Sequence, residues 1–451
     1  MRYAVVGCGP MGAAAALRLA ATEPDAELLL ADRDPQRVEE VAARLRAAGA
    51  TVRTLVGDTG DAGFQQAVAD ADAVAVALPW VAARPLLERL VACGSAAAGI
   101  GRPPDDALAG LGEAARRGRA RLILPVGLEP GLTEILARRA VSRLRACEQL
   151  RIWCGGIPLD PRPPLNHLAL YGDRLTITPR ATWSVRGGAL VRVPRFGGLE
   201  SVRVAGLGTL EAYDDGMLPG LVDDPVLGRV PEVSQKTLRW PGYAQKVRAF
   251  AECGLLDEQP RTVHDTRVAP RAVLDDVLAE HVRRREGDVD VTLLHIRATG
   301  GGDEDFETAT TTVVDRLDTD GLTSMARLTG FTLAACVRLL ATGQPAGYGL
   351  HTPQEVFAGR HGDELLAQLR AAGVQVTEQV AAGRRPAEEV LHHFALTGPA
   401  PEHTGPEHTD QDHTRPGHTG PGHAGPGHAG PEHAGATRTG TTHHDPMETN
   451  A

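Results

Sequence analysis

Aromatic residues and cysteines are scarce in this chain of 451 residues, and its 47 basic residues are outnumbered by 57 acidic ones. Aromatic residues make up 4% of it, and its six cysteines lack the spacing of a metal site or of a disulfide framework. The net charge is −10. Binding to nucleic-acid phosphates needs clustered basic residues, so we expect neither a nucleic acid nor an anionic membrane surface as a partner. The scattered cysteines give no reason to expect a metal site.

Long apolar runs are missing as well. No stretch reaches the roughly eighteen consecutive apolar residues that indicate a membrane-spanning helix. The N-terminus lacks the charged and apolar regions of a signal peptide. Together with cysteines that are typical of reduced, buried thiols, these absences predict a cytoplasmic protein.

Residues 1–150 alternate short apolar runs with segments of helical periodicity. The runs end near Gly, Pro or Asp, and they predict strands at 3–7, 27–32, 51–58, 72–79, 95–101 and 121–127. Strands that are apolar on both faces and are separated by helices predict an α/β domain with a doubly wound parallel sheet.

The pattern changes near residue 150. Residues 151–320 show the alternation of half-buried antiparallel strands, with a helix-like interruption at 234–254, and predict an α+β domain with a mixed sheet. The segment 321–397 begins with a predicted helix over 322–342. Residues 398–451 repeat Gly, Pro and His, which predicts a disordered tail; a store for metal ions is the alternative.

The stretch GCGPMG at 7–12 follows the first predicted strand and opens an Ala-rich helix. In that context it matches the glycine fingerprint of a Rossmann dinucleotide-binding domain. Gly7 permits the tight turn, Gly9 lets the backbone approach the pyrophosphate, and Gly12 lets helix and strand pack closely. Pro10 and Met11 begin the helix, whose N-terminal N–H groups face the phosphates.

Further candidates for cofactor binding follow the later strands. Asp32 ends the second strand, where an acid binds the ribose 2′-hydroxyl and favours NAD, whereas the adjacent Arg33 would suit NADP. Asp58 ends the third strand near the expected adenine position. Leu78 and Pro79 end the fourth strand, at the edge where the nicotinamide ribose is expected; simple turn and strand-ending roles are the alternatives for these three.

The stretch LPVGLEPGLTEILA at 124–137 resembles the saccharopine dehydrogenase superfamily, particularly shorter members such as lysine 6-dehydrogenase. CGGIP at 154–158, the segment 236–258 and DTDGLTSMARLTGF at 318–331 fit the same resemblance, in the same order. The resemblance covers most of residues 1–355.

This resemblance implies a Rossmann domain that is interrupted by an α+β catalytic domain, with C-terminal helices that return to complete the first domain. It implies oxidation of a C–N bond of an amino acid or amine, with hydride passing to a nicotinamide cofactor. It also implies a homodimer in which the sheet of the second domain supplies the contact.

The chemistry requires a cation for the substrate carboxylate and a group that takes the ammonium proton. The resemblance places Lys236 and Arg239 on the carboxylate; salt-bridged charges at a helix start are the alternative. His167 and Tyr243 are candidates for handling the proton or for orienting the substrate, and both types of residue also occur as structural groups. Glu129 is a candidate proton acceptor, or an acid that is favoured by a helix N-terminus.

Two stretches depart from the lysine-oxidising pattern, because apolar residues stand at 95–101 and at 125–126 where those relatives carry polar ones. The leading prediction is an oxidative deamination to a semialdehyde, as in lysine 6-dehydrogenase. A reductive condensation with NADPH, as in saccharopine or carboxynorspermidine dehydrogenases, is the second hypothesis. A non-catalytic dinucleotide-binding sensor is the third.

Overall fold

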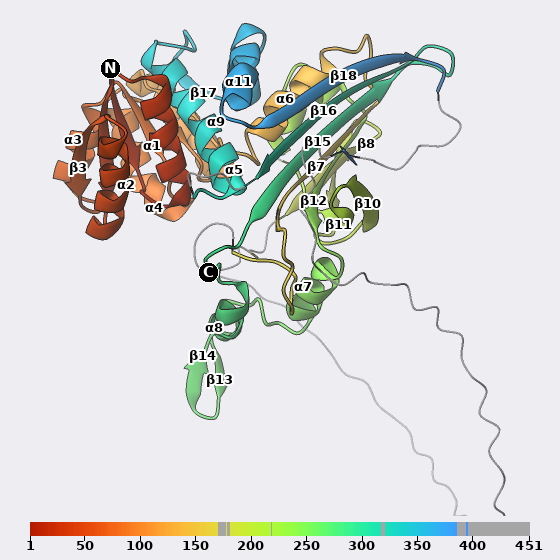
Figure 1. Ribbon diagram of the computed structural model, residues 1–451, viewed down its shortest axis with the longest axis horizontal. Helices are drawn as coiled ribbons and strands as arrows, with labels where there is room; N and C mark the ends of the chain where they lie inside the picture. The colour runs from red at the N-terminus through yellow and green to blue at the C-terminus, as the bar shows by residue number, and fades with distance from the viewer. Residues whose placement is uncertain (170–176, 178–180, 218, 317–320, 386–393, 396–451) are drawn as a thin grey trace, which may run out of the picture. The chain divides into compact units, whose positions relative to one another are not determined.

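The computed structural model describes residues 1–169, 177, 181–217, 219–316, 321–385 and 394–395. Within the compact unit Met1–Pro401 the chain forms two large sheets (Figure 1). The predicted tail at 398–451 lies outside the described residues, so its disorder stays a prediction.

The first sheet has seven strands, and every neighbouring pair is parallel. Their order is β17-β6-β5-β4-β1-β2-β3, which places the switch in winding direction between β1 and β4. The strands are β1 (Arg2–Val6), β2 (Glu27–Asp32), β3 (Thr51–Val56), β4 (Ala73–Val76), β5 (Ala96–Gly99), β6 (Arg121–Ile123) and β17 (Gly349–His351).

Helices cover both faces of this sheet, because its central strands are apolar on both sides. Tyr3 and Val5 pack on one face with α1, α2 and the later α9, and Ala4 and Val6 pack on the other with α3, α4 and α5. The predicted doubly wound parallel sheet is confirmed. These helices are α1 (Pro10–Thr22), α2 (Pro35–Ala47), α3 (Ala62–Ala69), α4 (Trp80–Ala92), α5 (Asp105–Gly118) and α9 (Ser324–Ala341).

The second sheet is mixed and has ten strands, which confirms the predicted α+β domain. Its main path runs β18-β16-β15-β7-β12-β11-β10-β19, with β8 paired to β12 and β9. The strands are β7 (Gln149–Pro158), β8 (Thr182–Arg186), β9 (Ala189–Val193), β10 (Glu200–Ala205), β11 (Gly208–Asp214), β12 (Glu232–Arg239), β15 (Asp290–Gly300), β16 (Phe306–Arg316), β18 (Gln375–Gly383) and β19 (Phe394–Ala395).

Helix α9 belongs to a core that includes residues of both sheets. It is the one described helix that is long and apolar enough to span a membrane, but 78% of it is buried inside the protein, as expected of a core helix. Three further helices lie beside this core: α6 (Leu132–Val141), α10 (Pro353–Val356) and α11 (Arg360–Ala371).

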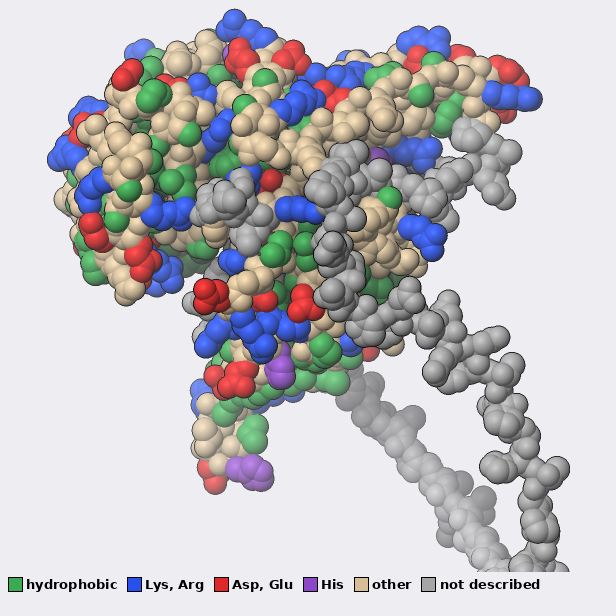
Figure 2. Space-filling model, in the orientation of Figure 1, with side chains coloured by type: hydrophobic (Ala, Val, Ile, Leu, Met, Phe, Trp, Pro, Cys, Tyr) green, Lys and Arg blue, Asp and Glu red, His purple; other side chains and the backbone are tan. Residues whose placement is uncertain are grey.

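An arm extends from the mixed sheet and consists of α7 (Tyr243–Glu252), the hairpin β13 (Arg261–Val263) and β14 (Thr266–Val268), and α8 (Pro270–Val282) (Figure 1). Two short 3-10 helices, Pro219–Asp223 and Leu227–Arg229, precede β12. Figure 2 shows acidic, basic and histidine side chains interspersed on the arm.

Three boundaries differ from the sequence-based prediction. Residues 234–239, predicted as part of a helix-like segment, lie in strand β12, and only α7 is helical there. The segment 321–397 does not join the parallel sheet throughout: β17 pairs with β6, whereas β18 pairs with β16 of the mixed sheet. Helix α6, placed in the first domain, packs against β15 of the mixed sheet.

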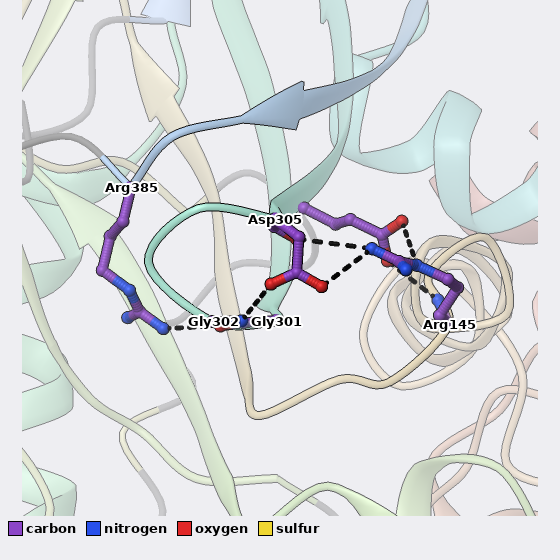
Figure 3. Close-up of polar contacts among 6 residues, drawn as sticks. Arg145, Gly301, Gly302, Asp305 and Arg385 are labelled. Carbon is purple, nitrogen blue, oxygen red and sulfur yellow. Dashed lines mark hydrogen bonds and ion pairs between the residues drawn. The ribbon is translucent and has the colours of Figure 1, made fainter.

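The turn between β15 and β16 is held by ion pairs and hydrogen bonds from distant segments (Figure 3). Asp305 accepts a hydrogen bond from the backbone N–H of Gly302 at 2.8 Å and forms an ion pair with Arg145 at 3.3 Å. Arg385, just after β18, donates to the carbonyl oxygen of Gly301 at 2.8 Å. These contacts fix the end of the long hairpin relative to its neighbours.

Candidate functional site

A cavity of about 800 Å³ begins at the carboxyl edge of the parallel sheet and reaches β7 and β12 of the mixed sheet. This volume is in the range of small-molecule sites, roughly 300–1,000 Å³. The predicted site residues that line it are Gly7, Gly9, Pro10, Met11, Asp32, Arg33, Asp58, Leu78, Pro79, Glu129 and Arg239. Most predicted cofactor residues and two predicted catalytic residues therefore share one cavity.

The glycine turn has the geometry that a dinucleotide pyrophosphate needs. Gly7 has φ +96°, and a Cβ there would lie 2.6 Å from the carbonyl oxygen of Ala77. A Cβ on Gly12 would lie 1.7 Å from the carbonyl oxygen of Gly7, so the close packing of helix and strand requires glycine. A Cβ on Gly9 would meet nothing within 4 Å, so the space beside this residue is open. Helix α1 starts at Pro10 without a side-chain cap, so its first N–H groups suit a phosphate.

Asp32, at the end of β2, lies beside this turn. Its carboxylate accepts hydrogen bonds from the backbone N–H groups of Cys8 at 2.7 Å and Asp34 at 3.0 Å, which fixes its orientation. Arg33 and Arg37 line the same part of the cavity. The carboxylate suits the ribose 2′-hydroxyl of NAD, and the two guanidinium groups suit the 2′-phosphate of NADP. The side chains at this end of the cavity are therefore compatible with either cofactor.

The other predicted cofactor residues lie at neighbouring strand ends. Asp58, two residues after β3, accepts a hydrogen bond from the N–H of Gly60 at 2.9 Å, which orders the turn. Pro79 is the N-cap residue of α4, and Leu78 precedes it. Trp80, the first residue of α4, also lines the cavity and was not predicted.

Glu129 lies at the other end of the cavity, in the loop between β6 and α6. Glu134, in the first turn of α6, accepts hydrogen bonds from the N–H of Gly131 at 2.5 Å and the hydroxyl of Thr133 at 2.6 Å and thereby orders this loop. Gln235 on β12 donates to Oε1 of Glu129 at 2.7 Å. Gln235 therefore orients the Glu129 side chain, and Glu134 orders the loop that carries it.

Cys154 on β7 lies in the cavity wall next to Glu129. Its thiol is buried, and burial and the Glu129 carboxylate raise the pKa of Cys154 well above its ordinary value. A thiolate is the nucleophilic form of cysteine. Cys154 therefore stays a neutral thiol near neutral pH.

Arg239, at the end of β12, shares the cavity with Asp215 and Thr237. The Thr237 hydroxyl donates to the Asp215 carboxylate at 2.9 Å. Asp215 also forms an ion pair with Arg195 at 2.5 Å. This end of the cavity presents a cation, carboxylates and a hydroxyl, which suits a substrate that carries both charges.

His167 and Tyr243 contact each other and lie next to Arg239, but they do not line the cavity. Their rings meet edge to face at 5.3 Å, and the Arg239 guanidinium lies 5.7 Å from the centre of the Tyr243 ring. Burial and the nearby Arg239 lower the pKa of His167 well below its ordinary value, so the imidazole is neutral. Glu211 accepts hydrogen bonds from the backbone at Gly242 and Ala244 and fixes the start of α7.

Lys236 lies on the opposite face of β12. In the pleated register Thr237 is paired with Cys154 and faces the cavity, whereas Lys236 is paired with Trp153. The Lys236 ammonium donates to the carbonyl oxygen of Gly198 at 2.5 Å and forms an ion pair with Glu200 at 3.1 Å. The structure thus does not bring Lys236 to the cavity with Arg239.

Sequence reasoning missed several residues that shape this end of the cavity. Gln235 and Thr237 alternate with Lys236 along β12, so a strand interpretation of 232–239 would have found them. Asp215 directly follows β11 and carried no motif. Met325 and Thr329, from the first turns of α9, line the cavity between its two ends.

Two family models match the chain. A model described as NADP oxidoreductase, coenzyme F420-dependent, matches residues 2–98. It covers the glycine turn and Asp32, and it confirms the prediction of a nicotinamide dinucleotide cofactor. A model described as saccharopine dehydrogenase C-terminal domain matches residues 127–374, which is more than half of the chain.

One solved structure agrees in fold over most of the chain. A saccharopine dehydrogenase (L-Glu forming) from Saccharomyces cerevisiae is 17% identical, with a TM-score of 0.67, and the match covers 84% of this chain and 100% of that one. An amine dehydrogenase from Mycobacterium smegmatis is 12% identical, with a TM-score of 0.40, over 78% of this chain and 95% of that one. With a dinucleotide turn, a mixed-sheet domain and a family match over 127–374, the chain belongs to the saccharopine dehydrogenase family and is an NAD(P)-dependent oxidoreductase.

Proposed function

We propose that the protein oxidises the CH–NH2 or CH–NH group of an amino acid, with deamination of the lysine 6-dehydrogenase type as the leading reaction. One observation carries this proposal: the Glu129 carboxylate and the Arg239 guanidinium line the same cavity as the dinucleotide turn. An amino acid offers a carboxylate for Arg239, and its amine offers a proton for Glu129.

The proposed roles follow from the positions of the side chains. Arg239 binds the substrate carboxylate through two parallel hydrogen bonds, the geometry that a guanidinium fork favours. Asp215 and Thr237 offer polar contacts to the same part of the substrate. Tyr243 packs beside the Arg239 guanidinium and limits its movement, and His167 supports Tyr243 as a neutral ring. Lys236 takes no part in this scheme, because its ammonium is bound on the other face of the sheet.

The reaction balances with one proton acceptor. Glu129 removes a proton from the substrate nitrogen, and the adjacent carbon loses its hydrogen as a hydride, so that a C=N bond forms. A bound oxidised nicotinamide supplies the acceptor for that hydride. Water then adds to the C=N carbon and ammonia leaves, which gives the carbonyl product. With lysine as substrate, the product is a semialdehyde that cyclises.

Reductive condensation of an amine with a carbonyl acid is the second candidate. Arg33 and Arg37 in the cofactor end of the cavity favour it, because NADPH carries a 2′-phosphate that suits guanidinium groups. A non-catalytic sensor is the third candidate, and the apolar residues at 125–126 favour it.

The test is a turnover assay at mildly alkaline pH that follows reduced nicotinamide by absorbance. Wild-type protein is mixed with NAD or NADP and a panel of amino acids and diamines, and Glu129→Gln serves as the inactive control. We expect reduction of NAD with lysine or a related amino acid. Oxidation of NADPH with an amine and a 2-oxo acid would favour condensation. No change of absorbance in either reaction direction, together with measurable cofactor binding, would favour the sensor.

We also propose that the protein is a homodimer that pairs through the mixed sheet in a reducing, cytoplasmic setting. Along β15 and β16, buried residues such as Leu294 and Ala309 alternate with half-buried ones such as His295 and Thr310, so one face of the sheet is partly exposed. All six cysteines are free thiols. Light scattering coupled to size-exclusion chromatography tests the dimer, and Thr310→Glu should dissociate it.

A further inference from the structure

A second cavity, of about 430 Å³, lies at the amino edge of the parallel sheet. Tyr3, near the start of β1, and Glu23, just after α1, form one side of it; Arg338 near the end of α9 and Arg360 at the start of α11 form the other. Dinucleotides bind at the opposite, carboxyl edge in this architecture. The two cavities share no lining residue, and α9 contributes its first turns to one and its end to the other.

The Tyr3 hydroxyl is the first sign that this cavity holds a ligand. Only 1% of the Tyr3 surface is exposed, and its hydroxyl forms no hydrogen bond with any residue in the described ranges. Burial, together with the negative charge of Glu23, raises the pKa of Tyr3 to about 12. The phenol is therefore a permanent hydrogen-bond donor at neutral pH. Tyr3 lines the cavity, so its hydroxyl can donate to an acceptor on a molecule bound there.

The charged side chains of the wall are the second sign. Arg360 and Glu364, both exposed residues in the first turns of α11, line the cavity, and neither forms an ion pair with a described residue or with the other. Arg338 and Glu23 instead form a pair with each other at 2.6 Å. The wall therefore offers one uncommitted cation and one uncommitted anion on the same helix, beside the Tyr3 hydroxyl. Leu339 and Phe357 add apolar surface.

We propose that this cavity is a binding site for a free amino acid, distinct from the substrate cavity. The ligand carboxylate meets the Arg360 guanidinium and accepts a hydrogen bond from the Tyr3 hydroxyl. The ligand ammonium meets the Glu364 carboxylate, and its side chain lies against Leu339 and Phe357. A simple anion such as phosphate would satisfy Arg360 and Tyr3 but would be repelled by Glu364.

Isothermal titration calorimetry on the whole chain tests this site, with L-glutamate, L-lysine, L-leucine, L-alanine and inorganic phosphate as probes. The site variants are Arg360→Ala, Tyr3→Phe and Glu364→Gln. Arg203→Ala is the matched control, because Arg203 is an exposed arginine on β10 outside both cavities. Arg239→Ala removes the cation of the substrate cavity and so separates the two sites.

We expect at least one amino acid to bind to wild-type protein and to the Arg203→Ala and Arg239→Ala variants with equal affinity. The affinity should fall about ten-fold or more in Arg360→Ala and by a smaller factor in Tyr3→Phe, because a charge-assisted hydrogen bond is worth more than a neutral one. Unchanged affinity in all three site variants would overturn the proposal. So would binding that disappears in Arg239→Ala, binding of phosphate alone, or no binding of any probe.

Discussion

Gln235 donates a hydrogen bond from its amide nitrogen to Oε1 of Glu129 at 2.7 Å, and this bond joins β12 of the mixed sheet to the loop after β6 of the parallel sheet. Because a carboxylate only accepts hydrogen bonds, the amide NH2 must face Glu129. Gln235 is 2% exposed, so the bond is protected from water. The proposed proton acceptor is thus oriented by a strand of the mixed sheet.

Glu129→Gln should reduce kcat by about 10²–10⁴-fold, which is the usual contribution of a general base. The amide keeps the shape and the hydrogen-bonding capacity of the side chain but cannot take a proton. Steady-state kinetics with the best substrate of the panel measure the effect. Glu113→Gln, on the exposed part of α5, is the control and should keep wild-type rates. If Glu129→Gln had the same kcat as wild type, another residue would have to be the general base.

Gln235→Met tests orientation apart from proton transfer. Methionine has a similar volume but cannot donate to Glu129, so we expect a loss of about ten-fold in kcat, less than for Glu129→Gln. The acid limb of the pH profile of kcat/KM should move upward, because a carboxylate that loses a donor holds a proton more tightly. A lower kcat with an unmoved pH profile would indicate a purely structural role.

Arg239 and Lys236 should give separable effects although they are three residues apart. Arg239→Lys keeps the charge but loses the planar fork, so KM for the amino acid should rise about ten-fold or more. Lys236→Met should leave KM unchanged and lower the melting temperature, because Glu200 and Asp214 lose their cation. Kinetics and thermal unfolding of both variants provide the comparison. A similar rise of KM in Lys236→Met would indicate that Lys236 contacts the substrate after all.

Gly9 and Gly12 form a matched pair at the cofactor end. A Cβ on Gly9 enters open space, and its φ of −67° suits any residue, so Gly9→Ala should fold normally but bind the dinucleotide about ten-fold more weakly. A Cβ on Gly12 lies 1.7 Å from the Gly7 carbonyl oxygen, so Gly12→Ala should lower the melting temperature. Thermal unfolding and titration with NAD and NADP separate the two effects. A stable Gly12→Ala protein would contradict this close packing.

The sequence predicted the dinucleotide turn well because that geometry is local. Gly7, Gly9 and Gly12 stand in one short stretch at a fixed spacing, directly after a short apolar run and directly before an Ala-rich helix. Strand β12 was harder, because the core side of this strand carries Gln235 and Thr237 in place of apolar residues. Because the strand lacks an alternation of apolar and polar residues, the three-residue spacing of Lys236 and Arg239 is typical of a helix. A helix would place both side chains on one face.

The pairing of strands that lie far apart in the sequence could not be predicted from local sequence patterns either. Nothing in the stretch 375–383 indicates β16 as its partner. The same limit applies to Asp215, which reaches the cavity because β11 pairs with β12. Residues that meet only through long-range strand pairing need the structure.

His167 should make the stability of the protein depend on pH. Burial, and to a smaller extent Arg239, lower the pKa of His167 well below its ordinary value. In the unfolded chain a histidine takes up a proton near pH 6.5, roughly, whereas the native imidazole stays neutral. As the pH falls below that value, the unfolded state therefore binds a proton that the native state does not. The stabilising contribution is present above about pH 6.5 and is lost as the pH falls.

The free energy of unfolding should thus decrease by up to about 1.4 kcal/mol per pH unit on the acid side because of this residue. His167→Gln removes the titrating group and should flatten that part of the curve. His281→Gln, on the exposed side of α8, is the control and should keep the wild-type slope. Urea unfolding of the three proteins between pH 5 and pH 8, roughly, gives the slopes. Parallel curves for wild type and His167→Gln would show that the native state does not lower the pKa of His167, which would contradict its burial as a neutral imidazole.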